Sequence, residues 1–192
     1  MTSPPRVITL DGGLTLRCYQ GDADLPEFHR AIDESLEHLR PWMPWIVEHS
    51  PAGTAGFLAR RAELWASGAE FSFAIVLDGA IVGSCGLARR TNSPADGLEI
   101  GYWLHPAVTG RGLATRTARA LVEEAFRLPG IGCVEIVHDV ANHASGAVPA
   151  RLGFTRALVR PAEPIAPAET GEEQVWRLTR QQAQALAAAE TH

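Results

Sequence analysis

The segment between Glu70 and Leu104 constrains the fold most, because it holds three β-type runs separated by short turns. The runs FSFAIVL, AIVGSCGLARR and LEIGYWL are rich in β-branched and aromatic residues, and Asp78-Gly79 separates the first two. An Asp-Gly pair between apolar runs is typical of a tight hairpin. The turn-rich stretch TNSPADG separates the second run from the third. The pattern therefore predicts a three-stranded antiparallel meander.

The chain before the meander is predicted to contain one strand and two helices. The run LTLRCY alternates apolar and polar residues, which indicates a strand over Leu14–Tyr19. Apolar residues at spacings of three and four predict an amphipathic helix over Asp22–Leu39. A second helix is predicted over Thr54–Ser67, with the threonine as its cap and Gly68 as a left-handed stop.

The chain after the meander continues with a helix over Gly112–Arg127, whose apolar residues keep a helical spacing. The run CVEIVHD reads as a strand, HASGAVPARLG as a short helix and FTRALVR as a strand. A strand-helix-strand unit of this kind builds a parallel pairing. A loop over Pro161–Glu173, a last strand at VWRLTR and a terminal helix at QQAQALAAA complete the prediction.

Composition and charge limit the classes of function. The 192 residues fit one compact domain of ordinary globular composition, with 46% hydrophobic and 20% charged residues. The net charge is −5 and lysine is absent, so no nucleic-acid partner is expected. No apolar run is long enough for a membrane span or a secretory signal, so we expect a soluble, intracellular protein. Cys18, Cys85 and Cys133 lack CxxC spacing, which favours core thiols over a disulfide framework or a metal site.

The turn between the third run and the next helix is the strongest functional signal. It reads Thr109-Gly-Arg-Gly-Leu-Ala114, and such a turn aims backbone N–H groups and the positive end of a helix dipole at one point, where an anion can sit. Gly110 and Gly112 allow close approach of a phosphate. A nucleotide P-loop would need a lysine, and a dinucleotide fingerprint would need a third glycine and an early βαβ unit. Both are therefore disfavoured.

The turn resembles the pyrophosphate loop of the GNAT acyltransferase superfamily, whose pattern is Gln/Arg-x-x-Gly-x-Gly/Ala, although Thr109 departs from its first position. A second block, Asn142-His-Ala-Ser145 followed by Ala150-Arg-Leu-Gly-Phe154, resembles the superfamily's Asn-x-x-Ser and Leu-Gly-Phe signature. The connector Pro41-Trp-Met-Pro-Trp45 and the strand Glu99-Ile-Gly-Tyr-Trp-Leu104 resemble the branch that acetylates ribosomal-protein N-termini, the RimJ/RimL-like branch. These motifs span nearly the whole chain.

The resemblance implies an α/β (α+β) acyl-CoA N-acyltransferase fold in a single domain over residues 1–192. Its sheet is mixed, mostly antiparallel, has about seven strands and is flanked by helices. The sheet opens in the middle, where the pantetheine arm of acetyl-CoA can pair with exposed backbone as an extra strand. No metal is implied. The residues that the resemblance assigns to acetyl-CoA binding are Tyr102, Trp103, Leu104, Thr109, Gly110, Arg111, Gly112, Leu113, Ala114, Thr115 and Asn142.

Acetyl transfer to an amine needs a proton acceptor, because only the neutral amine attacks a thioester. Glu99 is the first candidate, since its strand faces the cofactor and partial burial can raise the pKa of its carboxyl group. The alternative is a strand-edge charge that pairs with Arg89 or Arg90. His138 and Asp139, on the next strand, are further candidates for the base.

The leaving thiolate must be protonated or stabilised. Many members of the superfamily supply a tyrosine seven residues after the asparagine, where this chain has Pro149. The resemblance to the N-terminal acetylating branch makes Ser145 the candidate donor. Its alternative role is to cap the short helix.

The acceptor is expected to be a primary amine, first of all the N-terminal α-amine of a protein or peptide. Trp42 and Trp45 are candidates for binding it, because rigid aromatic rings shape pockets and attract cations, with core packing as the alternative. A small-molecule or antibiotic amine is a second acceptor class. A non-catalytic CoA-binding regulatory domain is a further alternative, favoured by Pro149. A homodimer is left open.

Overall fold

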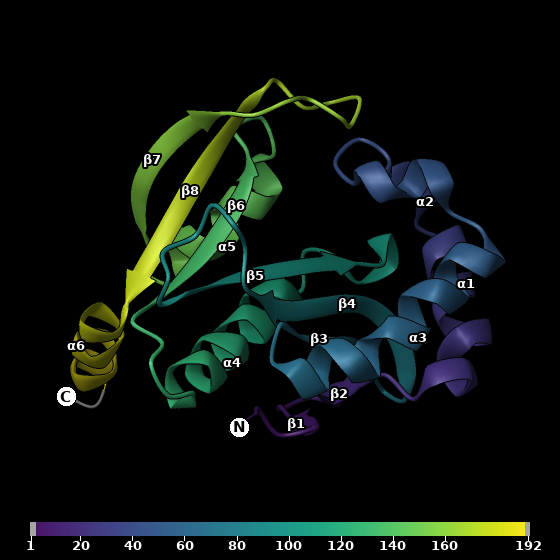
Figure 1. Cartoon of the computed structure of the whole chain (residues 1–192), viewed down its shortest axis with the longest axis horizontal. Helices are drawn as coiled ribbons and strands as arrows, with labels where there is room; N and C mark the ends of the chain where they lie inside the picture. Colours follow the sequence, from purple (N-terminus) through teal and green to yellow (C-terminus); the bar gives the residue numbers. More distant parts are fainter. Residues whose placement is uncertain (1–2, 191–192) are drawn as a thin grey trace.

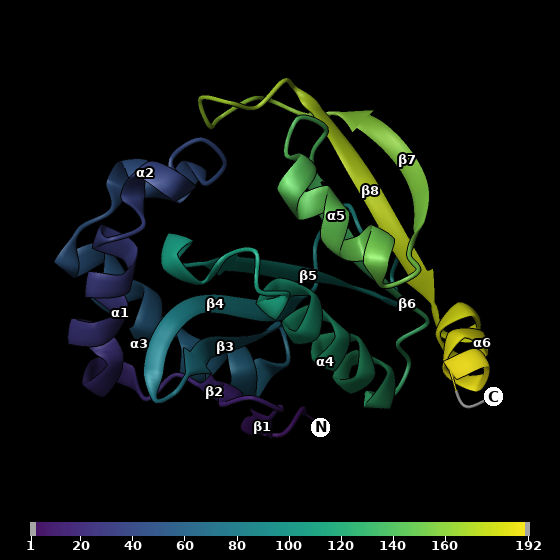
Figure 2. The same cartoon turned by 180° about the vertical axis from the view of Figure 1, so that it is seen from behind.

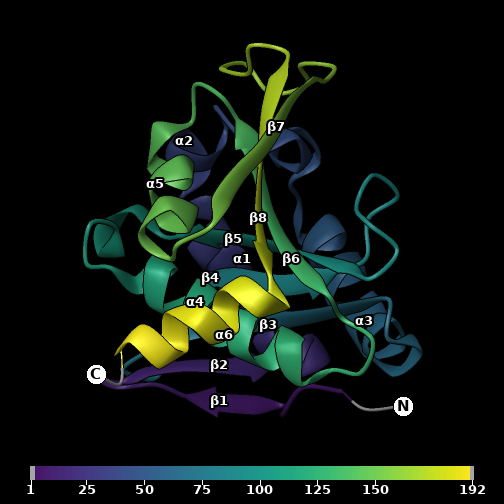
Figure 3. The same cartoon turned by 90° about the vertical axis from the view of Figure 1, so that its left-hand side faces the viewer.

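A single mixed sheet organises the molecule. The computed structural model describes residues 3–190, and within them eight strands lie in the order β1-β2-β3-β4-β5-β6-β8-β7. The strands are β1 (Val7–Thr9), β2 (Leu14–Cys18), β3 (Glu70–Leu77), β4 (Ala80–Ala88), β5 (Gly97–Leu104), β6 (Cys133–Asp139), β7 (Thr155–Pro161) and β8 (Glu172–Thr179). Figure 3 shows β1 and β2 at one end of the sheet and β7 at the other. Neighbouring strands are antiparallel, except for the parallel pair β5 and β6. The predicted mixed, mostly antiparallel sheet is confirmed, with β1 as an additional strand that the sequence analysis did not predict.

Helices cover both faces of this sheet. They are α1 (Leu25–Asp33), α2 (Leu36–Leu39), α3 (Pro51–Ser67), α4 (Leu113–Arg127), α5 (His143–Arg151) and α6 (Arg180–Glu190), with the 3-10 segments η1 (Gly21–Asp24), η2 (Pro44–Glu48) and η3 (Pro106–Val108). The helices α1 and α3 lie on the face seen in Figure 1. The helices α4 and α5 lie on the opposite face, toward the viewer in Figure 2. In the described part of the chain, no helix is both long enough and apolar enough to cross a bilayer.

Each face of the sheet buries its own apolar cluster. Leu121 of α4 packs with Phe73 of the sheet in the larger cluster, and Phe28 of α1 packs with Leu58 of α3 in the smaller one. Cys85 and Cys133 are buried, as predicted, whereas Cys18 is only half-buried. The prediction of three core thiols therefore holds for two of them.

The predicted meander is present as β3, β4 and β5. Its first turn is tight, because Leu77 pairs directly with Ala80. The two turn residues, Asp78 and Gly79, have φ angles of 51° and 87°. Two successive left-handed residues match the twist of an antiparallel hairpin, which explains the Asp-Gly signal in the sequence.

The helix predicted over residues 22–39 is interrupted. The structure has η1, α1 and α2 in that range, and the break falls at Glu34 and Ser35. The Ser35 hydroxyl donates to the carbonyl of Ala31 at 2.6 Å, so a buried side chain satisfies backbone where the helix ends. The apolar spacing continued across the break because Ile32 and Leu39 bury into the same cluster.

The helix α3 begins before the predicted cap. Ser50, rather than Thr54, is the N-cap, because its hydroxyl accepts a hydrogen bond from the backbone of Gly53 at 3.1 Å. Pro51 occupies the first helical position, where its missing N–H costs nothing. The predicted end of this helix is confirmed, since Gly68 follows it with a φ of 72°.

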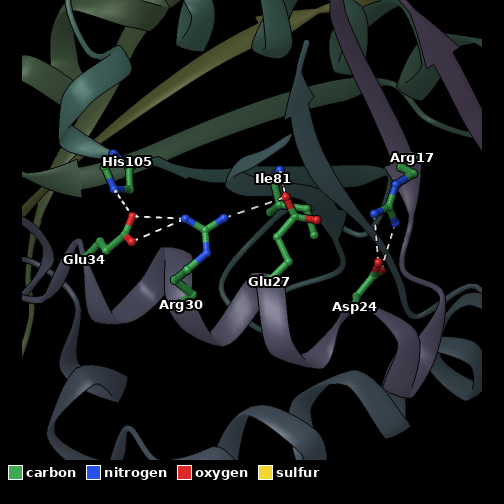
Figure 4. Close-up of polar contacts among 7 residues, drawn as sticks. All are labelled: Arg17, Asp24, Glu27, Arg30, Glu34, Ile81 and His105. Atoms are coloured by element: carbon green, nitrogen blue, oxygen red, sulfur yellow. Dashed lines mark hydrogen bonds and ion pairs between the residues drawn. The ribbon is translucent and has the colours of Figure 1, made fainter. Parts of the chain in front are cut away.

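Polar contacts fasten α1 and the residues on either side of it to β2, to β4 and to the residue that follows β5 (Figure 4). Asp24 accepts hydrogen bonds from Arg17 of β2 at 2.7 and 2.8 Å. The backbone N–H of Ile81 in β4 donates to Glu27 at 2.9 Å. At the other end of the helix, Oε2 of Glu34 lies 3.2 Å from Nε2 of His105, the residue just after β5. These contacts hold α1 at a fixed position on its face of the sheet.

The predicted parallel pairing of the two strands around α5 is wrong. β8 lies between β6 and β7 and pairs antiparallel with both, so the last strand of the sequence occupies the place that the simple strand-helix-strand unit would give to β7. The parallel pair is instead β5 and β6, which α4 connects. The sheet is therefore joined in its middle by a parallel crossover.

Candidate active site

The sheet opens between β5 and β6. These strands pair only at Gly97–Glu99, whose partners are residues 133–135. Beyond that point β5 pairs with β4 as far as Leu104, while β6 pairs with β8 as far as Asp139. Figure 1 shows the two strands diverging. The predicted opening is therefore present, and it leaves two facing edges whose backbone groups do not pair with each other.

A cavity of about 830 Å³ lies at this opening. Its walls come from α1, the connector before α3, α3, the strands β3 to β6, the start of α5, and β8 with the loop before it. Clefts of this size with a few polar groups are typical of ligand sites. The predicted site residues among its walls are Trp42, Trp45, Glu99, Tyr102, Trp103, His138, Asp139, Asn142 and Ser145. The fold thus gathers the proton-transfer candidates and the two tryptophans in one place, whereas Leu104 and residues 109–115 of the glycine turn are not among these walls.

Glu99 presents a partly buried carboxylate to the cavity. Its side chain is 21% exposed, and its Oε1 lies 3.5 Å from Nε of Arg90, which is itself half exposed. Burial raises the pKa of Glu99, and the charge of Glu173 adds to this, while Arg90 and Arg160 act in the opposite direction. The predicted ion pair with Arg90 is present, and Glu99 also lines the cavity, where its role as a base stays a prediction. The net direction of the pKa fits a proton acceptor.

Tyr102 and Ser145 meet across the opening. The Tyr102 hydroxyl donates to the backbone carbonyl of Ser145 at 3.2 Å and lies 3.4 Å from its Oγ. Burial raises the pKa of Tyr102 to about 12, against a smaller opposing effect of its bond to Ser145. The phenol therefore stays protonated at neutral pH and remains a hydrogen-bonding neighbour of Ser145, the predicted donor to the leaving thiolate.

The alternative that Ser145 caps the short helix is wrong, because Asn142 is the N-cap of α5. The Asn142 side-chain oxygen accepts from the backbone N–H of Ser145 at 3.1 Å. This bond orients the asparagine amide and presents the serine hydroxyl on the cavity side. The motif Asn-x-x-Ser thus has a local structural reason in addition to its predicted role.

His138 is poorly placed to act as the base. Its Nδ1 lies 2.7 Å from the carbonyl of Asp139, and its Nε2 accepts from the indole N–H of Trp176 at 2.9 Å. Asp139 is also engaged, by Ala141 and Thr170. Burial raises the pKa of Asp139, but these hydrogen bonds outweigh it and hold the pKa below its ordinary value. Glu99 is therefore the stronger of the predicted candidates.

The glycine turn before α4 has the geometry of an anion site. Gly110 and Gly112 have φ angles of 73° and 74°, and a Cβ at either position would meet no other atom within 4 Å. Gly112 is the N-cap of α4, and no side chain caps the helix, so N–H groups of its first turn point outward without that partner. Arg111 is exposed beside them. A diphosphate group fits these residues.

Not every predicted cofactor residue offers its side chain. Leu113 is 3% and Leu104 is 8% exposed, and both belong to the apolar core. Ala114 and Thr115 are half-buried in the first turn of α4, while Thr109 is exposed and donates its hydroxyl hydrogen to Pro106. The two leucines can therefore contact a ligand only through their backbone.

One wall of the cavity is aromatic. The Trp45 and Trp103 rings lie 6.2 Å apart, and Trp103 is buried against Phe28 on the α1 face of the sheet. Trp45 is 42% exposed, while Trp42 is half-buried and also lines the cavity. Trp103, which the resemblance assigned to acetyl-CoA, therefore lies on the α1 face of the sheet, in contrast to its neighbour Tyr102, whose hydroxyl contacts Ser145 of α5.

The sequence analysis missed a group of charged wall residues. They lie on separate elements and share no motif, so only the tertiary fold brings them together. More of them are acidic than basic, which suits a cationic acceptor. They are Glu48, Arg60, Glu70, Glu169 and Glu173.

Comparison with known families gives one match over most of the chain. The family described as "Acetyltransferase (GNAT) domain" matches residues 14–155. In Bacillus subtilis (strain 168), the protein named "Putative ribosomal N-acetyltransferase YdaF" is 35% identical over 82 residues. That stretch spans 42% of this chain and 43% of the relative, so less than half of either protein is matched.

Solved structures share the fold over nearly the whole chain. One is described as RimL, the ribosomal L7/L12 alpha-N-protein acetyltransferase, in complex with coenzyme A. It has a TM-score of 0.83 at 21% identity and covers 92% of this chain and 99% of its own. Another is described as the microcin C7 self immunity acetyltransferase MccE in complex with acetyl-CoA and AMP, with a TM-score of 0.82 at 19% identity, covering 91% and 97%. At these identities the likeness shows the fold alone.

Proposed function

Because this chain belongs to the acetyltransferase (GNAT) domain family, we propose that it moves the acetyl group of acetyl-CoA onto the N-terminal α-amine of a protein or peptide. The chain is an acetyltransferase, close to ribosomal-protein acetyltransferases. The observation that carries the proposal is the opening between β5 and β6, where the Glu99 carboxylate and the Tyr102–Ser145 pair face one cavity.

The donor side of the cavity fits acetyl-CoA. The free edge of β5 offers backbone groups to the pantetheine arm, as an added strand would. The N–H groups at Gly112 and the first turn of α4 suit the diphosphate, and the amide of Asn142 suits the arm from the other side. When bound, acetyl-CoA supplies a thioester carbonyl open to attack by an amine.

Two groups of the chain handle the protons in this proposal. Glu99 accepts the proton that the ammonium form of the acceptor must lose, directly or through a water molecule. Ser145 donates a hydrogen bond to the sulfur of the leaving group, with the Tyr102 hydroxyl behind it. This pair takes the place of the tyrosine that Pro149 excludes.

The acceptor class follows from the other side of the cavity. Its aromatic wall and its excess of acidic residues suit an ammonium group. YdaF and RimL carry names of ribosomal acetyltransferases, which supports a protein N-terminus as the acceptor. MccE is a self immunity acetyltransferase, and this likeness keeps a small-molecule amine as the second candidate.

The test is mass spectrometry of a mixed library of N-terminal peptides and small amines, incubated with the full chain and acetyl-CoA. We expect a mass gain of one acetyl group on peptide α-amines, and none when acetyl-CoA is left out. Acetylation of small amines alone would assign the second acceptor class. Calorimetric binding of acetyl-CoA without any product would instead indicate the non-catalytic CoA-binding domain.

A further inference from the structure

Two histidines and one carboxylate form a compact group outside the catalytic pair. His29 and Asp33 are one turn apart on α1, and His49 follows η2 in the connector to α3. Nε2 of His49 lies 2.8 Å from Oδ1 of Asp33, and Nε2 of His29 lies 3.5 Å from its Oδ2. In residues 3–190, one ligand atom from each of these residues lies within 4.8 Å of the other two.

The donor set selects a class of ion. Two imidazoles and one carboxylate are ligands of Zn²⁺ and related first-row divalent ions, whereas Mg²⁺ and Ca²⁺ prefer oxygen alone. Two atoms that both bind Zn²⁺ at about 2.0 to 2.2 Å in a tetrahedral site lie roughly 3 to 3.5 Å apart. The distance from His29 to Asp33, 3.5 Å, matches that spacing, whereas the 2.8 Å contact of His49 with the other oxygen of Asp33 is a hydrogen bond that the ion would replace. The three ligand atoms lie within 4.8 Å of one another, so an ion would draw together side chains that are already neighbours.

Thr54 orients the ring of His29 from behind. Nδ1 of His29 lies 2.9 Å from Oγ1 of Thr54, and the Thr54 hydroxyl donates to the carbonyl of Ser50 at 3.1 Å. In that arrangement Thr54 accepts from Nδ1–H, so the lone pair of a neutral His29 lies on Nε2, facing the Asp33 carboxylate. A lone pair and a carboxylate repel each other unless a cation lies between them. Metal-bound histidines commonly donate their second N–H to such a partner.

The three side chains are ordered but reachable. The rings of His29 and His49 stack with centroids 4.5 Å apart. The side chain of His49 is 8% exposed and that of His29 is 20% exposed, so both are held by their surroundings. Asp33 is 50% exposed, which leaves an entry path for an ion and room for water as a further ligand.

We propose that His29, Asp33 and His49 bind one divalent transition-metal ion, with Zn²⁺ as the representative, and that this ion fastens the connector to α1. The sequence analysis expected no metal site on the basis of the cysteine spacing, and none of the three proposed ligands is a cysteine. His49 also lines the cavity, and the connector carries Trp42 and Trp45. The site is structural, and its test does not depend on acetyl transfer.

The test uses the full chain without an affinity tag, after treatment with a chelator. Titration with Zn²⁺ in a calorimeter should give one bound ion per chain, and Co²⁺ should give the visible absorption of a site with nitrogen and oxygen ligands. Bound Zn²⁺ should also raise the melting temperature. The variants His49→Ala and Asp33→Asn should each lose stoichiometric binding, and Thr54→Val should weaken it roughly ten- to hundredfold.

Matched controls separate this site from adventitious binding. His38→Ala and His143→Ala remove exposed histidines elsewhere and should bind like the parent. Each variant should show a cooperative melting transition in the chelator, which shows that each one folds. The proposal is overturned if the parent binds no ion. Binding that survives in the site variants, or a cobalt–thiolate band from a cysteine, would overturn it as well.

Discussion

At the residue scale, two glutamates paired in register have different environments. Glu99 of β5 lies opposite Glu135 of β6. Glu135 is 1% exposed and accepts two hydrogen bonds from Arg177, at 2.7 and 2.9 Å, whereas Glu99 faces the cavity with a looser partner in Arg90. The sequence could nominate Glu99 from its motif. It could not show that burial raises the pKa of this carboxyl group more than Arg90 lowers it. The degree of burial depends on where β5 and β6 diverge, which no local pattern specifies.

Replacing Glu99 by Gln should lower kcat by about a hundredfold, because the variant lacks a proton acceptor. The raised pKa of Glu99 places the rising limb of the parent's pH profile above the ordinary range of a glutamate, since activity grows as the carboxylate ionises. The variant should lose that limb while its affinity for acetyl-CoA, measured by calorimetry, is unchanged. The matched control is Glu123→Gln on the exposed side of α4, which should behave like the parent.

Folding provides a second check on Glu99. A carboxyl group whose pKa is raised by folding contributes stability at low pH that is lost as the pH rises through the folded-state pKa. The neutral amide of Glu99→Gln therefore should not lower the free energy of unfolding at neutral pH. If the variant keeps the parent's kcat and pH profile, Glu99 is not the base.

The Ser145–Tyr102 pair predicts a non-additive loss of activity. Ser145→Ala should lower kcat roughly ten- to hundredfold, and Tyr102→Phe should lower it less, because the phenol acts through the serine. The double variant should resemble Ser145→Ala, since residues in one hydrogen-bonded unit are coupled. Steady-state kinetics of the four proteins gives the coupling. Fully additive losses would mean that the two hydroxyl groups act independently.

At the scale of elements, local sequence signals predicted turns and helix ends, which depend on a few neighbouring residues. They failed to predict which strands pair when those strands are far apart in the sequence. The Asp78-Gly79 hairpin and the stop at Gly68 were predictable because each depends on a local backbone conformation. The position of β8 between β6 and β7 was not, because only long-range pairing determines it. The break at Ser35 was hidden by an apolar spacing that two helices share.

The N-cap of α3 is a prediction at this scale. Ser50→Ala should lower the free energy of unfolding by about 1 kcal/mol, because it leaves the backbone N–H of Gly53 without its capping partner. Denaturant unfolding measures the change. Ser67→Ala, at the exposed end of the same helix, is the control and should stay within about 0.5 kcal/mol of the parent. An equal loss in both variants would contradict the assignment of Ser50 as the cap.

At the scale of the whole molecule, the diverging sheet forms two arms that are joined at three residue pairs. A second link closes the far side, where the backbone N–H of Ala168, in the loop before β8, donates to the carbonyl of Pro41 at 3.1 Å. The family resemblance predicted the opening. The link was not predictable, because it joins two loops whose conformations no local pattern specifies.

Acetyl-CoA should protect the opening from hydrogen exchange. We expect slower exchange in residues 100–104 of β5 on addition of acetyl-CoA, because the free strand edge gains a hydrogen-bonding partner. Exchange in β1 and β2, at the far end of the sheet, should not change. Mass spectrometry of peptic fragments reports both regions. Equal protection across the whole sheet would point to general stabilisation rather than to an added strand.

Because Tyr102 and Trp103 are consecutive residues of β5, the number of residues before them determines the face of the sheet on which each side chain lies. Consecutive side chains of a strand emerge on opposite faces, so Tyr102 contacts Ser145 of α5 while Trp103 packs against Phe28 of α1. Under the proposed function, the first serves the thioester compartment and the second the amine compartment. Insertion or deletion of a single residue in β5 before them would exchange the two compartments while leaving the chemistry of every residue intact. Only changes by an even number preserve the assignment, so the length of this strand is itself part of the active site.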